Sequence, residues 1–195
     1  MPFFPLLLVG AVVAAEPILL DTGTGILHGT LETPAAKPSW PVVLIIAGSG
    51  PTDRDGNSSM LRGRNDSLKM LAEGLAAREI ASLRYDKRLI GESMIFGLKE
   101  EDLRFDIYVD DAVRWGEYLR KDSRFRSLVI AGHSGGSLIG MLAARRLAAN
   151  GYVSMEGPGR ESSAFCPAGM PWADREIANT ASLTKRNIVT QAITS

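Results

Sequence analysis

A serine inside a glycine-rich turn is the feature of this sequence with the clearest chemical potential. Ser134 is the central residue of Gly-His-Ser-Gly-Gly at 132–136. The apolar run 128–131 precedes this pentapeptide and a small-residue helical pattern follows it, so we expect a strand, a tight turn and a helix. Only small neighbours fit beside a serine at such a turn. The pattern predicts a nucleophile elbow that presents Ser134 to a carbonyl group.

A second glycine-rich segment could stabilise the negative charge that such an attack creates. The β-branched run 42–47 predicts a central parallel strand, and Gly48-Ser49-Gly50 follows it directly. Backbone N–H groups at the carboxyl ends of parallel strands face the crevice where ligands bind. We therefore expect an oxyanion contribution from Ser49 or Gly50. A phosphate-binding loop is the alternative for the 132–136 turn, but no Gly-Lys-Ser/Thr follows its glycines.

The composition favours one globular domain and excludes several classes of partner and site. The 195 residues are 45% hydrophobic and 23% charged, and 22 basic residues balance 22 acidic ones. With no net positive charge, we expect no nucleic-acid binding. The single cysteine, Cys166, cannot form an intrachain disulfide. We interpret Asp110 and Asp111 as a solvated helix face and expect neither a metal nor another cofactor.

Strand and helix patterns alternate along the chain. This alternation predicts an α/β fold with a mostly parallel, doubly wound sheet and an amino-terminal antiparallel hairpin. We expect Asn65 or Asp66 to cap the first helix and Gly151 to close the last one. The expected strands are 17–21, 26–31, 42–47, 80–85, 128–131 and 152–155, and the expected helices begin near 66, 105 and 138.

The two ends of the chain differ in character from its centre. Residues 1–15 form an apolar block that ends in small residues, which predicts a secretory signal peptide removed after Ala15. We therefore expect a periplasmic or secreted protein, with a cytoplasmic protein as the alternative. The block is too short for a stable membrane span. We assign the core to 16–160 and a divergent tail to 161–195, and the abrupt change near 160 predicts a truncated or frame-shifted product.

Three motifs in order resemble the bacterial α/β-hydrolases of the esterase and serine-aminopeptidase-like group. They are Ile-Ala-Gly-Ser-Gly-Pro-Thr-Asp-Arg-Asp-Gly-Asn at 46–57, Leu-Arg-Tyr-Asp-Lys-Arg at 83–88 with Gly-Glu-Ser at 91–93, and Ala-Gly-His-Ser at 131–134.

The resemblance implies an α/β-hydrolase fold that is incomplete at its carboxyl end. It implies hydrolysis of a small-molecule carboxylic ester or acyl compound through an acyl-enzyme on Ser134. The N–H groups of Gly135 and of Ser49 or Gly50 would form the oxyanion hole. Leu89 stands where the family usually has glycine, and Gly135 stands where an acidic residue often follows the nucleophile.

The histidine that completes the catalytic triad in this fold follows the last strands, and no histidine follows His133. We interpret His28 as a half-buried strand residue and expect the His133 ring to be directed away from Ser134. The chain as written should then show little or no turnover, and its last strand should leave an unpaired sheet edge. A catalytically inactive remnant and a peptidase or thioesterase of the same fold are the alternatives. The sequence leaves the oligomeric state open.

Overall fold

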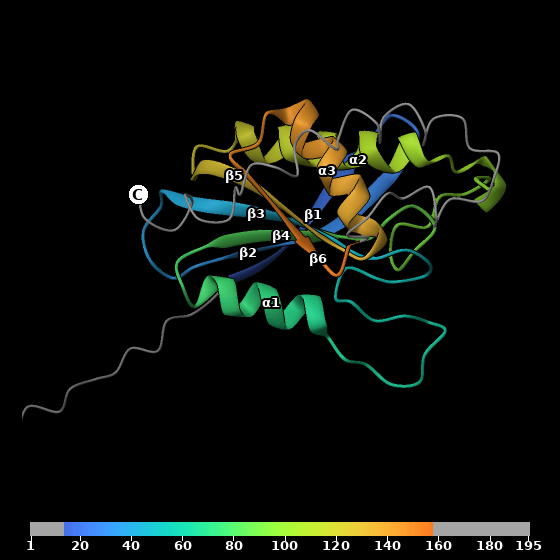
Figure 1. The fold of residues 1–195 in the computed structure, drawn as a ribbon, viewed down its shortest axis with the longest axis horizontal. Coiled ribbons are helices and arrows are strands. Elements are labelled where there is room, and N and C mark those ends of the chain that lie inside the picture. Colours follow the sequence, from blue (N-terminus) through green and yellow to red (C-terminus); the bar gives the residue numbers. More distant parts are fainter. Residues whose placement is uncertain (1–13, 158–195) are drawn as a thin grey trace, which may run out of the picture.

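The apolar run after Pro38 forms β3 (Trp40–Ile46), a central strand of a six-stranded sheet with helices on both faces (Figure 1). The computed structural model describes residues 14–157. In chain order the other elements are β1 (Ala14–Asp21), β2 (Ile26–Thr33), α1 (Ser67–Ala76), β4 (Ala81–Tyr85), the 3₁₀ turn η1 (Glu100–Asp102), α2 (Phe105–Lys121), β5 (Phe125–His133), α3 (Gly135–Leu147) and β6 (Gly151–Met155).

The strands lie in the order β1-β2-β4-β3-β5-β6. β1 and β2 form the antiparallel hairpin, and β2 also runs antiparallel to β4. The remaining pairs are parallel, with Leu44 of β3 opposite Leu83 of β4 and Ile130 of β5. This mixed, mostly parallel sheet confirms the expected fold class. It also makes β3 and β5 neighbours, so the loops that follow these two strands leave the same edge of the sheet side by side.

Alternate side chains of β3 supply two cores, one on each face of the sheet. Leu44 belongs to the cluster under α2 and α3, together with the fully buried Trp115. Its neighbour Ile45 belongs to the cluster that includes Leu68 and Ala72 of α1. In Figure 1, α2 and α3 cover the upper face and α1 covers the lower one. Burial on both faces explains why β3 is a continuous apolar run.

The free backbone N–H groups at the start of α1 are hydrogen-bonded differently from the sequence expectation. Asp66 occupies the N-cap position in a left-handed conformation and its side chain makes no capping bond. The Ser67 N–H donates to the Asn65 side chain at 3.1 Å, and the Leu68 N–H donates to the Asp55 backbone oxygen at 3.0 Å. The long loop before α1 therefore supplies a main-chain acceptor to the helix start that sequence spacing cannot reveal.

The end of α3 also corrects a prediction. The helix closes at Ala148, which has a left-handed φ of 44°, and Gly151 is instead the first residue of β6. Helix ends commonly adopt this conformation with glycine, and alanine adopts it here at a steric cost.

Residues 1–13 and 158–195 lie outside the described part of the chain. The signal peptide expected at 1–15 and the tail expected at 161–195 therefore stay predictions. Cys166 also lies outside the described residues. Ala14 and Ala15 open β1, opposite Thr33 and Glu32 of β2. Across residues 14–157, no helix combines the length and the apolar character that crossing a membrane would require.

Candidate active site

Ser134 occupies a strained turn between β5 and α3. Its backbone has φ 50° and ψ −123°, an unfavourable conformation that costs on the order of 1–3 kcal/mol. The Ser134 N–H donates to the Met155 oxygen of β6 at 2.8 Å. A Cβ on Gly132 would lie 2.3 Å from the Gly136 oxygen, and a Cβ on Gly136 would lie 2.5 Å from the Ala47 oxygen. Both glycines are therefore required by space, as the sequence predicts.

The loop that follows β3 lies against this turn. A Cβ built on Gly48 would be 3.4 Å from the Cβ of Ser134, and one built on Gly135 would be 3.3 Å from the backbone nitrogen of Ser49. Gly135 is the first residue of α3, so its N–H lacks a partner within the helix. The structure thus brings Ser134, Gly135 and Ser49 together from β5, α3 and the β3 loop. Ser134 and Gly135 are half-buried, and Ser49 is exposed.

Gly50 is the remaining residue expected near an oxyanion. Its φ is 71°, and nothing lies within 4 Å of the position that a Cβ would occupy. The Gly50 oxygen accepts hydrogen bonds from the Thr52 N–H at 2.8 Å and from Lys87 Nζ at 3.3 Å. Its conformation favours glycine, and we regard the Ser49 N–H as the better placed donor because the Ser49 nitrogen lies close to Gly135.

Lys87 is a buried cation behind this loop. It follows β4 closely, only 6% of it is exposed, and its ammonium donates to the Gly48 oxygen as well as to that of Gly50. Burial lowers the pKa of Lys87 to about 8, while the neighbouring Asp86 acts in the opposite direction. Sequence spacing assigned no role to Lys87. A signal was present, because three charged residues in a row follow a buried strand in one of the three motifs.

Asp86 ties two loops together beside the site. Its carboxylate accepts hydrogen bonds from the Arg54 N–H at 2.7 Å and from the Glu92 N–H at 3.0 Å, and it pairs with the Arg54 guanidinium at 3.1 Å. Burial raises the pKa of Asp86, and these bonds oppose that shift. A Cβ on Gly91 would lie 2.3 Å from an Asp86 oxygen. The motif at 83–93 therefore holds the loops that flank the site.

Leu89 has a φ of 63°, a conformation that favours glycine. A glycine here would avoid the backbone strain that Leu89 bears. Its N–H still donates to the Ser93 oxygen at 3.0 Å, so the turn closes.

The interpretation of Asp111 as solvated was wrong. Asp111 is 1% exposed and forms a two-pronged ion pair with Arg88, at 2.7 Å for both Nε and Nη2. Asp110 does face solvent and pairs with Arg146 at 2.7 Å. Adjacent helix residues point about 100° apart, so one can be buried while its neighbour is exposed. Sequence spacing alone could not show which of the two faced the sheet.

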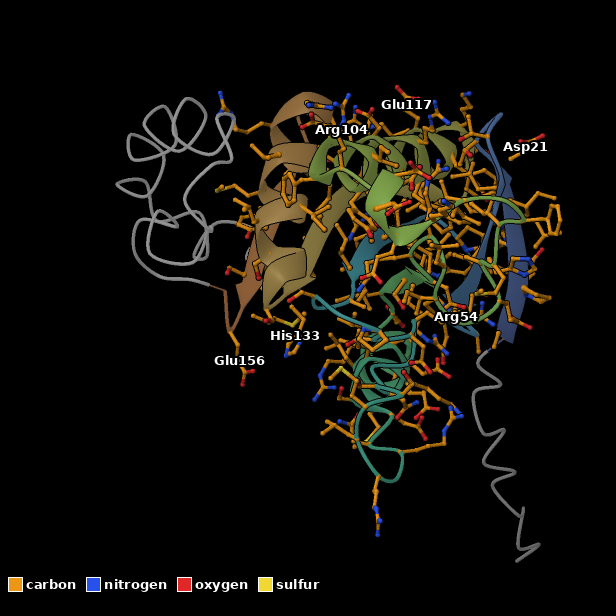
Figure 2. The ribbon with its side chains drawn as sticks, turned by 90° about the vertical axis from the view of Figure 1, so that its right-hand side faces the viewer. Asp21, Arg54, Arg104, Glu117, His133 and Glu156 are labelled. Carbon is orange, nitrogen blue, oxygen red and sulfur yellow. The ribbon has the colours of Figure 1, made fainter. Side chains whose placement is uncertain are left out.

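Both histidines of the chain lie within the described residues, and each has an identified hydrogen-bond partner. His133 Nε2 lies 3.2 Å from a Glu156 carboxylate oxygen, and Figure 2 shows this pair together beyond the ends of β5 and β6. His28 is a half-buried residue of β2, as expected, and its N–H donates to Ser93 Oγ at 2.9 Å. Over residues 14–157, neither imidazole is hydrogen-bonded to Ser134. Nor does that part of the chain gather three or more histidine, cysteine, aspartate or glutamate side chains that could hold a metal ion.

A cavity of about 310 Å³ opens between the long loop after β3 and the turn that follows β4. Its wall includes Pro51, Asn57 and Arg64 from the loop, and Leu89 and Ile90 from the turn. Neither Ser134 nor Ser49 lines it. The cavity is therefore distinct from the serine turn, none of whose residues 132–136 lines it.

Comparisons with known proteins give related results from sequence and from structure. No protein-family model matches the chain. The sequence is 28% identical to the esterase EstD of Thermotoga maritima over 137 residues, which is 69% of this chain and 31% of EstD. The chain thus spans about a third of the length of that esterase.

Solved structures share the fold. An α/β serine hydrolase without a lid from Xanthomonas campestris has a TM-score of 0.55 and 25% identity, covering 82% of this chain and 66% of its own. Est1E of Butyrivibrio proteoclasticus, solved with ferulic acid bound, has a TM-score of 0.56 and 26% identity, covering 69% of this chain and 50% of its own.

Proposed function

We propose that this chain, an α/β-hydrolase by its fold and its similarity to bacterial esterases, carries an ester-hydrolase site with Ser134 as the nucleophile. The observation that carries the proposal is the convergence of three groups at one sheet edge. Ser134 lies half-buried in the strained turn, the Gly135 nitrogen follows it directly, and the Ser49 nitrogen lies 3.3 Å from the position that a Cβ on Gly135 would occupy. This proximity supports a nucleophile elbow with two oxyanion donors. The esterases among the similar proteins favour a small-molecule ester over a peptide or a thioester.

In the proposed reaction, Ser134 Oγ attacks the ester carbonyl carbon and gives up its proton to solvent water. The carbonyl oxygen becomes an oxyanion, which the N–H groups of Ser49 and Gly135 and the amino-terminal end of α3 stabilise. Collapse of this intermediate expels the alcohol, which takes up a proton and leaves the acyl group on Ser134. Water then attacks the acyl-enzyme and releases the carboxylic acid.

Removal of the proton from Ser134 limits the rate of hydrolysis by this chain. His133 is paired with Glu156, and His28 is held in β2, so neither serves Ser134 as a base in the described structure. The oxyanion donors and substrate binding alone give about 10³–10⁴-fold acceleration over water. We therefore expect a slow, Ser134-dependent hydrolysis.

The same observation favours a second candidate from another class. A site with oxyanion donors and no base for Ser134 among residues 14–157 could bind small acyl ligands without turning them over. The proposed periplasmic or secreted location applies to either function and rests on the apolar residues 1–15 alone.

Hydrolysis of p-nitrophenyl acetate and butyrate by the purified full chain tests the proposal. The matched control is Ser123→Ala, which changes an exposed serine between α2 and β5. We expect Ser134→Ala to reduce the rate to background and Ser123→Ala to leave it unchanged. A rate that Ser134→Ala leaves intact would refute the nucleophile assignment. Saturable binding of the esters without any Ser134-dependent release of p-nitrophenol would favour the acyl-binding alternative.

A further inference from the structure

Lys87 spans the two carbonyl groups that flank Ser49. Its ammonium donates to the Gly48 oxygen and, at 3.3 Å, to the Gly50 oxygen. The first contact joins residues 39 positions apart, from the ends of the neighbouring parallel strands β3 and β4. Lys87 thus holds the loop after β3 at two carbonyl groups.

The bond to Gly48 determines where the next N–H points. In a trans peptide the C=O of one residue and the N–H of the next point in opposite directions. Because the Gly48 oxygen faces Lys87, the Ser49 N–H faces away from Lys87. The Ser49 nitrogen lies 3.3 Å from the position that a Cβ on Gly135 would occupy. The Ser49 N–H is therefore directed to the side where α3 begins.

A buried lysine is an expensive way to hold a loop. Moving an ammonium out of water costs free energy, and here two carbonyl dipoles and the adjacent Asp86 carboxylate offset only part of that cost, since the pKa of Lys87 stays lowered, at about 8. Groups with a strongly perturbed pKa beside a crevice concentrate at functional sites. A neutral side chain would suffice for packing alone, so the charge needs another explanation.

We propose that Lys87 is a positioning residue of this site, whose ammonium holds the Gly48–Ser49 peptide in the orientation that presents the Ser49 N–H to the oxyanion. This inference rests on the proposed ester-hydrolase function. Lys87 touches neither the substrate nor Ser134 in this scheme. Its contribution appears only when negative charge develops on the carbonyl oxygen, because the Ser49 N–H is needed most at that moment.

The first test compares Lys87→Met and Lys87→Arg with Lys69→Met, which removes an exposed lysine of α1. Loss of one oxyanion donor lowers kcat by about 10²–10³-fold. We expect Lys87→Met to reduce the Ser134-dependent kcat for p-nitrophenyl acetate by about 10²-fold with little change in KM, since the interaction acts in the transition state. Lys87→Arg should restore part of the loss, and Lys69→Met should match the parent chain. A folded Lys87→Met variant with the parent kcat would refute the proposal.

A second readout does not depend on activity. In amide nitrogen–proton spectra of the full chain, the Ser49 resonance should move between pH 7 and 9.5 with a midpoint near 8, as Lys87 loses its proton. Lys87→Met should shift the Ser49 resonance and abolish this midpoint. A Ser49 resonance whose position changes neither with pH nor in the Lys87→Met variant would refute the positioning role. If hydrolysis is independent of Ser134 while the Ser49 resonance follows Lys87, the proposed function fails and the inferred contact stands. If Lys87→Met is insoluble, the pH titration of the parent chain decides.

Discussion

Replacing Asp111 should destabilise the fold far more than replacing its neighbour Asp110. Asp111 and Arg88 are paired at 2.7 Å with side chains 2% and 6% exposed. Removing the carboxylate in Asp111→Asn leaves the Arg88 charge buried without its counterion. Such a loss costs about 3–5 kcal/mol of unfolding free energy.

Asp110→Asn is the matched control on the adjacent residue of α2. Asp110 and Arg146 are also 2.7 Å apart, but their side chains are 56% and 43% exposed. Exposed pairs of this kind contribute about 0–1 kcal/mol, because water screens the charges and both side chains lose freedom. The two substitutions make the same chemical change one position apart, so burial is the variable that they compare.

Urea unfolding of the full chain, followed by tryptophan fluorescence, to which the buried Trp40 and Trp115 contribute, measures both effects. With a denaturant slope of about 2 kcal/mol per molar, Asp111→Asn should lower the midpoint by about 2 M, and Asp110→Asn should lower it by less than about 0.5 M. Equal shifts for the two variants would refute the assignment of Asp111 to a buried ion pair. The double variant Arg88→Met with Asp111→Leu should regain part of the lost stability, because it removes both charges together.

Three further perturbations test the backbone and the buried charge. Gly136→Ala places a Cβ 2.5 Å from the Ala47 oxygen and should lower the free energy of unfolding in urea by about 1–3 kcal/mol. Gly74→Ala, with no atom closer than 3.9 Å, should stabilise α1 by about 0.5–1 kcal/mol. A Gly136→Ala variant as stable as the parent chain would contradict the tight turn. Leu89→Gly should raise the unfolding free energy by about 1 kcal/mol by relieving the positive φ, and a decrease would mean that the leucine side chain contributes more than its strain costs. Because the folded pKa of Lys87 is about 8 and the unfolded value is 10.5, the unfolded chain binds the extra proton between those pH values. The stability of the parent chain relative to Lys87→Met should therefore rise from pH 8 to 10.5, by up to about 3 kcal/mol, and a flat difference in unfolding free energy between pH 7.5 and 10 would contradict this.

Local spacing in the sequence was enough to predict the elements of the fold. The continuous apolar run of β3 reflects burial on both of its faces, and the 3.6-residue pattern of α2 reflects burial on one face. The helix ends were less predictable. Asp55 supplies the acceptor at the start of α1 from twelve residues before Ser67, and Ala148 adopts a conformation that its residue type disfavours.

The sequence by itself also determined the candidate chemistry. Gly132 is required by contact with Gly136, only four residues away, so this part of the spacing encodes the turn directly, whereas Gly136 is required by the Ala47 oxygen at the end of β3. Ser49 followed from its place at the end of a buried strand, because parallel strands present their carboxyl ends at one edge.

Only the tertiary structure decided which charged side chains are buried and what they contact near the site. Asp110 and Asp111 are equivalent in the helical pattern, and the Arg88 that distinguishes them comes from a different element, 23 residues away. The contact of Lys87 with Gly48 exists because β4 packs beside β3 with their carboxyl ends aligned. A periodic pattern records which face of an element is buried, whereas an ion pair or a clamped peptide depends on the distance between segments that the chain alone leaves unspecified.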